Sequence, residues 1–283
     1  MSDRWIEEKI HDGIITSYRA DTLYFETGTG HQHLAIFEHA KFGKMLTLDG
    51  IAQLAERDEF IYHEMMAHVP ILAHGAARSV LIIGGGDGGM LRRVLMHPGV
   101  EKATMVEIDP AVTEMCLEHF PDVSNGAFED PRTNLVYGDG AAFVHDSADR
   151  FDVIIVDSTD PIGPAEVLFT REFYTDCKAH LNEGGVLVIQ SGLPFMQPWE
   201  LTATAEHFRA LFTAPSAYIA TIPSYIGGNM VFGWGSDDPS LLDIPVETLR
   251  ERFNALDLNT RYYTPEFHKA AFILPVYLRE LTE

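Results

Sequence analysis

Five acidic side chains stand at the ends of apolar segments or just after them, in positions where they could surround one ligand. They are Asp87, Glu107, Asp139, Asp157 and Asp160. Like charges in one crevice cost free energy unless a cation joins them. The sequence therefore indicates a cationic ligand, and a metal ion and an organic cation are the two candidates.

The glycine-rich segment GGGDGG at 84–89 has the spacing G-x-G-x-x-G and lies between a predicted strand and a predicted helix. Glycines let the backbone turn sharply and let a ligand approach without a Cβ in the way. Glu107 follows about 20 residues later, where folds of this kind hydrogen-bond a ribose diol. The pattern predicts a nucleoside-containing ligand. The alternative is a tight turn in an unliganded α/β fold.

Asp87, inside this loop, bears on which nucleoside binds. A fixed carboxylate there would repel the pyrophosphate that a dinucleotide places at a helix N-terminus. It favours a phosphate-free ligand with a positive group, such as a sulfonium nucleoside; the alternative is that Asp87 caps the helix. Asp139 and Gly140 follow a later strand and suit recognition of an adenine amino group, although Gly-Asp-Gly is also a common turn.

The segment DSTDPIGP follows another apolar run and presents two carboxylates three residues apart, Asp157 and Asp160. Pro161 and Pro164 restrict its backbone, and Gly163 permits a tight bend between them. Ligands of open α/β sheets bind outside the carboxyl ends of the strands. We therefore expect this loop to face the nucleoside site.

Two kinds of side chain could complete a site for a cation. His63 and His68 resemble a zinc-helix motif, but their spacing of five places them about 140° apart on a helix, which excludes a zincin site. Tyr62, Tyr225 and Trp234 could instead form an aromatic wall for the methylenes and ammonium of an organic cation. For each of these rings taken alone, core or sheet packing is the favoured alternative.

The chain has 283 residues, 46% of them hydrophobic, and a formal net charge of −22, which is typical of a globular protein with a solvated acidic surface. A nucleic-acid partner is not expected, because the sequence has no basic cluster for a phosphate backbone. The charged N-terminus lacks a signal-type apolar region, and no run of 18 apolar residues occurs. We expect a cytoplasmic protein without a membrane partner.

The elements that must position these side chains fall into two predicted domains, 1–57 and 58–283. The first contains short strands and tight turns, and the second begins with a helix and continues as alternating strands and helices. This alternation predicts a doubly wound, Rossmann-type α/β sheet after a small β domain. The expected strands are 22–26, 33–37, 44–50, 79–84, 102–107, 133–137, 151–157 and 185–190, with an antiparallel pair at 217–221 and 229–234, and the expected helices are 58–70, 88–97, 110–120 and 170–181.

Several motifs occur together in one order, from Trp5 to Leu274-Pro275. They are Gln53, ERDEFIYHE at 56–64, the GGGDGG loop, MVEID at 105–109, YGDG at 137–140 and DSTDPIGPAE at 157–166. This combination resembles the spermidine synthase family, the polyamine aminopropyltransferases. The resemblance implies a small β domain, a methyltransferase-like α/β domain, and a homodimer or homotetramer. It also implies aminopropyl transfer from decarboxylated S-adenosylmethionine to putrescine, giving spermidine and 5′-methylthioadenosine, without a metal or prosthetic group.

The resemblance also implies roles for individual side chains. Those expected to hold the donor nucleoside and its aminopropyl arm are Gln32, Gln53, Asp87, Glu107, Asp139, Gly140 and Pro164. Those expected along the polyamine channel are Tyr62, His63, Asp87, Asp157, Ser158, Thr159, Asp160 and Tyr225. Asp157 would accept the proton, directly or through Tyr62 and water. Ile226 lies where the family varies, so putrescine is preferred to cadaverine, agmatine or longer polyamines by resemblance alone.

The implied reaction fits these residue types. An alkylamine has a pKa of about 10.4, so the acceptor arrives protonated and must give a proton to a group such as Asp157 before it attacks. Asp87 would attract the free amine of the decarboxylated donor and repel the carboxylate of ordinary S-adenosylmethionine. Two alternatives are methyl transfer to a small amine, which would release S-adenosylhomocysteine, and an inactive polyamine-binding protein, which would not depend on Asp157.

Overall fold

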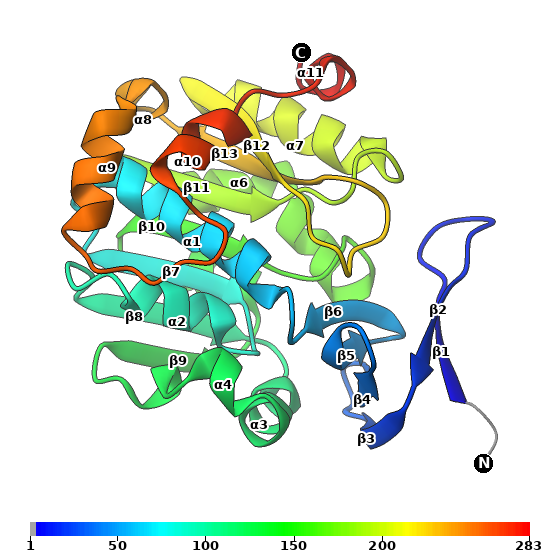
Figure 1. Cartoon of the computed structure of the whole chain (residues 1–283). Helices are drawn as coiled ribbons and strands as arrows, with labels where there is room; N and C mark the ends of the chain where they lie inside the picture. The colour runs from blue at the N-terminus through cyan, green and yellow to red at the C-terminus, as the bar shows by residue number, and fades with distance from the viewer. Residues whose placement is uncertain (1–3) are drawn as a thin grey trace.

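The computed structural model describes residues 4–283, except for the side chain of Pro164. Short N-terminal strands form two small antiparallel sheets, and the rest of the chain builds a seven-stranded sheet covered by helices (Figure 1). The predicted fold class, a doubly wound α/β sheet after a small β domain, is confirmed. Within residues 4–283, every helix is too short or too polar to cross a membrane.

The N-terminal strands are β1 (Arg4–Glu8), β2 (Thr16–Ala20), β3 (Thr22–Gly28), β4 (His33–His39), β5 (Gly43–Leu48) and β6 (Ile51–Ala55). β1 pairs with β2, and β3 to β6 form a meander in sequence order. The three strands expected here are confirmed as β3, β4 and β5, whereas the sequence analysis does not predict β1, β2 or β6. Asp49 and Gly50 both have positive φ between β5 and β6, as a type I′ hairpin turn requires.

The large sheet has the order β12-β13-β11-β10-β7-β8-β9. Its strands are β7 (Ser79–Gly84), β8 (Lys102–Glu107), β9 (Thr133–Tyr137), β10 (Phe151–Asp157), β11 (Leu181–Gln190), β12 (Ala214–Ala220) and β13 (Met230–Ser236). β7 to β11 are parallel, and β13 is antiparallel to both of its neighbours. The chain winds outward through β8 and β9 and then crosses back to β10. This reversal creates a switch point at the carboxyl ends of β7 and β10, where Gly84 and Asp157 are register partners.

Helices cover both faces of this sheet because alternate side chains of its central strands are apolar in both directions. Ile82 and Ile155 belong to the core that α1 and α2 cover, whereas Leu81 and Ile154 belong to the core under α5, α6 and α7. The helices are α1 (Glu59–His74), α2 (Gly89–Leu95), α3 (Pro110–His119), α4 (Pro121–Ser124), η1 (Ala127–Glu129), α5 (Gly140–Asp146), η2 (Gly163–Phe169), α6 (Arg171–Ala179), α7 (Pro198–Leu211), α8 (Ser240–Asp243), α9 (Val246–Asn254), α10 (Pro265–Ala271) and α11 (Val276–Thr282).

Several predicted boundaries are wrong, and at α1 and β11 the physical reason is clear. α1 continues through Pro70 to His74, although proline has no N–H to donate inside a helix. Every residue of 61–73 is buried, so packing around this central helix outweighs the missing bond. The predicted strand at 185–190 begins earlier, at Leu181, because Leu181 pairs with Phe151 of β10, and the preceding helix therefore ends at Ala179.

Candidate active site

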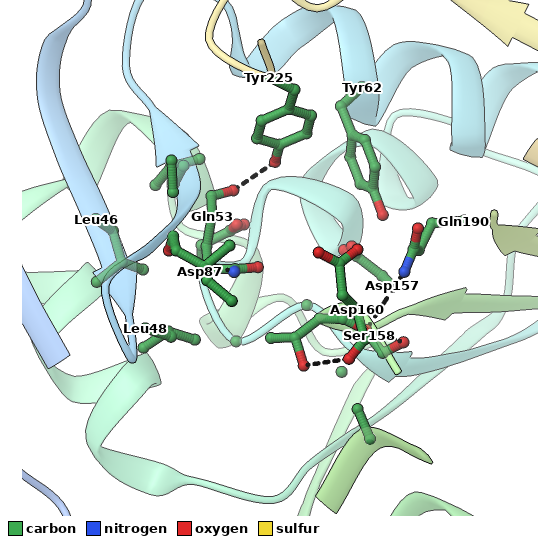
Figure 2. A pocket seen from close by; sticks show the side chains of 18 of the residues that line it. Leu46, Leu48, Gln53, Tyr62, Asp87, Asp157, Ser158, Asp160, Gln190 and Tyr225 are labelled. Atoms are coloured by element: carbon green, nitrogen blue, oxygen red, sulfur yellow. Dashed lines mark hydrogen bonds between the residues drawn. The ribbon is translucent and has the colours of Figure 1, made fainter. Parts of the chain in front are cut away.

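A cavity of about 250 Å³ opens at the switch point, between the strand ends of the large sheet and the β5–β6 hairpin. Figure 2 shows side chains from both parts of the chain around it, including Leu46 and Gln53 from the small sheet and Asp87 and Asp157 from the large one. The predicted site residues that line it are Gln32, Gln53, Tyr62, His63, Asp87, Glu107, Asp139, Gly140, Asp157, Ser158, Thr159, Asp160 and Tyr225. The remaining one, Pro164, has a side chain outside the described part of the structure.

The glycine loop after β7 passes so close to its neighbours that side chains would not fit. Gly84 and Gly85 have φ values of 83° and 74°, which residues with a Cβ rarely adopt. A Cβ on Gly85 would stand 2.9 Å from Asp157 Oδ2, and one on Gly86 would stand 2.8 Å from Glu107 Oε2. The loop thus leaves room for carboxylates of both neighbouring strands at one wall of the cavity.

The end of β8 forms the part of the wall where Glu107 lies. Glu107 Oε1 accepts the Asp109 N–H at 2.8 Å, and burial raises the pKa of Glu107 to about 7. Asp109 Oδ2 accepts from Thr29 Oγ1 at 2.6 Å and from Gln32 Nε2 at 3.0 Å. Asp109 therefore fixes Gln32 and the β3–β4 loop. The sequence analysis did not assign Asp109 a role, although it is the last residue of the MVEID motif.

Asp139 and Gly140 lie where β9 leads into α5. Asp139 Oδ1 accepts the N–H groups of Ala141 and Ala142 at 2.8 and 3.1 Å, so Asp139 caps this helix. Its side chain also lines the cavity, and the cap fixes the direction in which the carboxyl points. Capping and ligand contact are therefore compatible at this position.

Asp87 is part of a buried chain of alternating charges. Its Oδ1 accepts the Gly89 N–H at 2.6 Å and lies 3.5 Å from His63 Nε2. His63 Nδ1 lies 2.7 Å from Glu59 Oε2, and Glu59 Oε1 lies 3.3 Å from an Arg93 Nη2. Burial alone would favour the neutral imidazole, but Asp87 and Glu59 together raise the pKa of His63 to about 10. His63 is therefore an imidazolium at neutral pH, held between two carboxylates.

The sequence analysis expected His63 at the cavity but missed Glu59 and Arg93. Glu59 precedes His63 by four residues, a spacing that places both on one face of α1. This spacing, within the ERDEFIYHE motif, was the sequence signal that could have identified Glu59. Arg93 had no comparable signal, because α2 brings it to Glu59 only through packing on α1.

Asp157 ends β10 with its carboxyl buried in the cavity wall. Burial, together with the charge of Asp87, raises the pKa of Asp157 to about 6, although His63 and Tyr62 act in the opposite direction. Oδ2 of Asp157 has no hydrogen-bond partner among the residues the structure describes. A carboxylate with a free oxygen and a pKa near neutrality can accept a proton from a ligand.

Tyr62 and Tyr225 form the aromatic wall that the sequence predicts, but Trp234 does not. The two tyrosine rings pack edge to face with centroids 6.2 Å apart, and Tyr225 Oη donates to the Gln53 carbonyl oxygen at 2.6 Å (Figure 2). Trp234 is fully buried in β13 and packs against Phe272, because its strand position points into the core under α1. For Trp234 the alternative of core packing therefore holds.

The far end of the cavity is built from amides and carboxyls. Gln190 Nε2 donates to the Thr159 carbonyl oxygen at 3.3 Å (Figure 2). Gln190 Oε1 accepts the Gly192 N–H at 2.8 Å. Burial raises the pKa of Asp160, and a hydrogen bond from Gln197 partly offsets this. The sequence analysis missed Gln190 and Gln197. Gln190 ends a parallel strand, which was the signal for it, whereas Gln197 had none.

The two histidines of the zinc-like segment point apart, as their spacing predicts. His63 faces Asp87, whereas His68 Nδ1 lies 2.9 Å from His97 Nε2 in the core. Within residues 4–283, no three or more His, Cys, Asp or Glu side chains are grouped as metal ligands would be. Of the two candidates for the cation, the donor arrangement therefore gives no support to a metal ion.

Comparison with known proteins places this cavity in a family. Residues 59–243 match the model of the spermine/spermidine synthase domain, and residues 4–56 match that of the spermidine synthase tetramerisation domain. The chain belongs to the spermine/spermidine synthase family. It is 53% identical over 277 residues to the polyamine aminopropyltransferase of Ruegeria sp., covering 98% of each chain. It is 55% identical to polyamine aminopropyltransferase 1 of Pseudomonas aeruginosa, covering 98% of this chain and 96% of that one.

Solved structures agree with this family. The chain superposes with a TM-score of 0.93 and 34% identity on a spermidine synthase in complex with the transition-state analogue AdoDATO, covering 100% of this chain and 96% of that one. The spermidine synthase of Thermotoga maritima gives a TM-score of 0.90 at 32% identity, covering 100% and 95% of the two chains. The resemblance inferred from the sequence is confirmed, and the protein is an aminopropyltransferase of polyamine biosynthesis.

Proposed function

We propose that this aminopropyltransferase is a spermidine synthase, which transfers the aminopropyl group of decarboxylated S-adenosylmethionine to putrescine. The observation that carries the proposal is the pair of carboxyls, Asp87 and Asp157, that line one cavity without any described Lys or Arg side chain in its lining. Such a cavity favours a ligand that carries several positive charges. The complex of a 34% identical spermidine synthase with AdoDATO supports the same reaction class.

The donor nucleoside would lie along the glycine loop. Glu107, at the end of β8, would accept hydrogen bonds from the ribose diol, and Asp139 and Gly140 would contact the adenine. Gln32 would close this end from the small sheet, held by Asp109. We also propose that Pro164 lies beside the nucleoside, and only the family resemblance supports this position.

The aminopropyl arm would extend toward Asp87 and Gln53. Asp87 would bind the ammonium of the arm, and His63 with Glu59 would hold the Asp87 carboxyl in place. A donor with a carboxylate at this position would meet Asp87 directly. We therefore expect the site to prefer decarboxylated S-adenosylmethionine to S-adenosylmethionine.

In the reaction, the neutral amine nitrogen of putrescine attacks the aminopropyl carbon that is bonded to the sulfonium. The new C–N bond forms as the C–S bond breaks, and its electron pair returns to sulfur, so neutral 5′-methylthioadenosine leaves. Before the attack, the reacting nitrogen, which arrives as an ammonium, gives one proton to Asp157, directly or through Tyr62 and water, and the secondary ammonium formed by the attack leaves as part of protonated spermidine. The sulfonium is already an activated leaving group, so alignment of the two substrates supplies much of the rate.

The rest of the polyamine would lie between the tyrosines and the 158–160 loop. Tyr62 and Tyr225 would contact its methylenes, and Asp160 would face its second ammonium, with Ser158 and Thr159 shaping the loop. We infer putrescine as the acceptor from the same resemblance, rather than cadaverine, agmatine or a longer polyamine.

We also propose a boundary between two domains at residue 57 and a homo-oligomer, either a dimer or a tetramer. The two family models stop and start on either side of this boundary, at residues 56 and 59, and the first is a tetramerisation domain. A cytoplasmic location and the lack of a metal or prosthetic group stay predictions.

Incubation with both substrates tests the proposed function. We expect release of 5′-methylthioadenosine together with spermidine, measured by liquid chromatography. With S-adenosylmethionine as donor, release of S-adenosylhomocysteine would identify a methyltransferase instead. No product from either donor, with substrate binding retained, would indicate a binding protein and refute the proposal.

A further inference from the structure

A buried carboxyl without an assigned role lies next to the cavity, at the end where Asp160 stands. Glu200 is in the first turn of α7, and 3% of its surface is exposed. Its Oε2 is buried and accepts no hydrogen bond from any described residue. A buried polar atom without a partner costs free energy, so a ligand group that supplies the partner would be favoured there.

Gly192 is the residue of the cavity wall behind which Glu200 lies. Gly192 lines the cavity two residues after Gln190 and has a φ of 68°. A Cβ at this position would stand 2.9 Å from the carboxyl carbon of Glu200. The carboxyl therefore occupies the space that a side chain at position 192 would fill, and the glycine leaves it beside the cavity.

Several carboxyl groups lie near this end of the cavity. Burial and the charge of Asp160 raise the pKa of Glu200 to about 8, so Glu200 is mostly protonated at neutral pH until a cation binds beside it and favours the carboxylate. Burial also raises the pKa of Glu8, which the charge of Asp160 raises further. No described Lys or Arg side chain lines the cavity, and the imidazolium of His63 is already paired with Glu59 and Asp87. An ammonium group of the ligand would supply the missing positive charge.

We propose that Glu200 is a specificity-determining residue that, with Asp160, receives the second, non-reacting ammonium of the acceptor diamine beside Gly192. This inference rests on the proposed function, because it takes an aliphatic diamine as the acceptor. The inference adds the Glu200 carboxyl, from α7, to the residues of the polyamine channel. The family resemblance did not assign Glu200 a role. Glu200 thus recognises the charge at the far end of the acceptor, and it takes no part in proton removal at the near end.

The comparison of putrescine with n-butylamine tests this role, because n-butylamine has the same four carbons but no second amino group. In Glu200→Gln, we expect kcat/KM for putrescine to fall about tenfold or more, mainly through KM, and kcat/KM for n-butylamine to stay within about twofold. Glu206→Gln is the matched control, since Glu206 is exposed on the same helix, and it should change neither value.

Equal losses for both amines would show a structural role for Glu200 and overturn the inference, and so would an unchanged putrescine KM. Thermal unfolding checks that the variant folds. If Glu200→Gln does not fold, Glu200→Asp, which withdraws the carboxyl by one methylene, should still raise the putrescine KM selectively, and a wild-type KM would refute the inference. A wild-type protein that converts neither amine would refute the proposed function instead.

Discussion

The Glu59–His63–Asp87 chain predicts how stability depends on pH, and Glu59→Gln tests it. The two carboxylates raise the pKa of His63 from 6.5 to about 10 in the folded protein. Each pKa unit corresponds to about 1.36 kcal/mol, so the pair favours the folded imidazolium by about 5 kcal/mol. His63 is almost fully buried, so water screens little of this interaction.

Because the folded pKa of His63 is the higher one, its contribution is fully present below pH 6.5 and is lost as the pH rises through 10. Glu59 makes the shorter of the two contacts, at 2.7 Å against 3.5 Å for Asp87. We expect Glu59→Gln to remove about half of the effect, about 2 kcal/mol, near pH 6 and little of it near pH 10. Glu59→Gln also removes the contact between Glu59 and Arg93, and this loss lowers the free energy of unfolding by an amount that does not change over this pH range.

Urea unfolding of wild type and Glu59→Gln at a series of pH values measures the difference, and NMR of labelled histidines follows the His63 titration directly. Glu114→Gln, an exposed change on α3, is the control and should give a constant small difference. A loss of stability that is equal at pH 6 and pH 9.5, or a His63 that titrates near 6.5 in the wild type, would refute the reasoning.

Three further predictions concern the cavity wall. Gly86→Ala should weaken binding of 5′-methylthioadenosine about tenfold, measured by calorimetry, because the added Cβ would stand 2.8 Å from Glu107 Oε2; unchanged affinity would show that the wall can yield. Asp58→Asn should lower the free energy of unfolding by about 1–3 kcal/mol in chemical denaturation, because Asp58 accepts both the N–H and the hydroxyl of Ser224 at 2.7 and 3.0 Å; a difference below 0.5 kcal/mol, roughly the scatter of surface changes, would contradict this. The log of kcat/KM should fall with a slope of about one below pH 6, since Asp157 must be ionised to accept a proton; a profile flat to pH 5 would exclude it as the base.

The large sheet follows well from the sequence because its central strands are apolar on both faces, and β7, β8 and β10 end at a glycine or an acid. Ser79–Gly84 and Phe151–Asp157 are both confirmed at their predicted bounds. The β1–β2 hairpin could not be predicted, because strands of five residues that face solvent show only weak alternation, with Tyr18 the one buried residue of the pair. The Asp49-Gly50 turn, by contrast, was a readable signal for β6.

The candidate site divides in the same way. Residues at strand ends, such as Glu107 and Asp157, are recoverable because parallel strands bring their carboxyl ends to one edge. Glu200 and Arg93 are not, since each reaches the site from a helix and only the packing of that helix decides which way it points. The sequence also left the place of Trp234 open between cavity and core, because an aromatic residue in a buried strand carries no sign of which face it occupies.

The rate of 5′-methylthioadenosine release in a single turnover tests the central claim most directly. With enzyme in excess over decarboxylated S-adenosylmethionine and with saturating putrescine, we expect Asp157→Asn to release it at least about 100-fold more slowly than wild type. Its affinity for 5′-methylthioadenosine should stay unchanged. A wild-type rate in Asp157→Asn would contradict the account, because the buried carboxyl at the end of β10 would then not accept the proton.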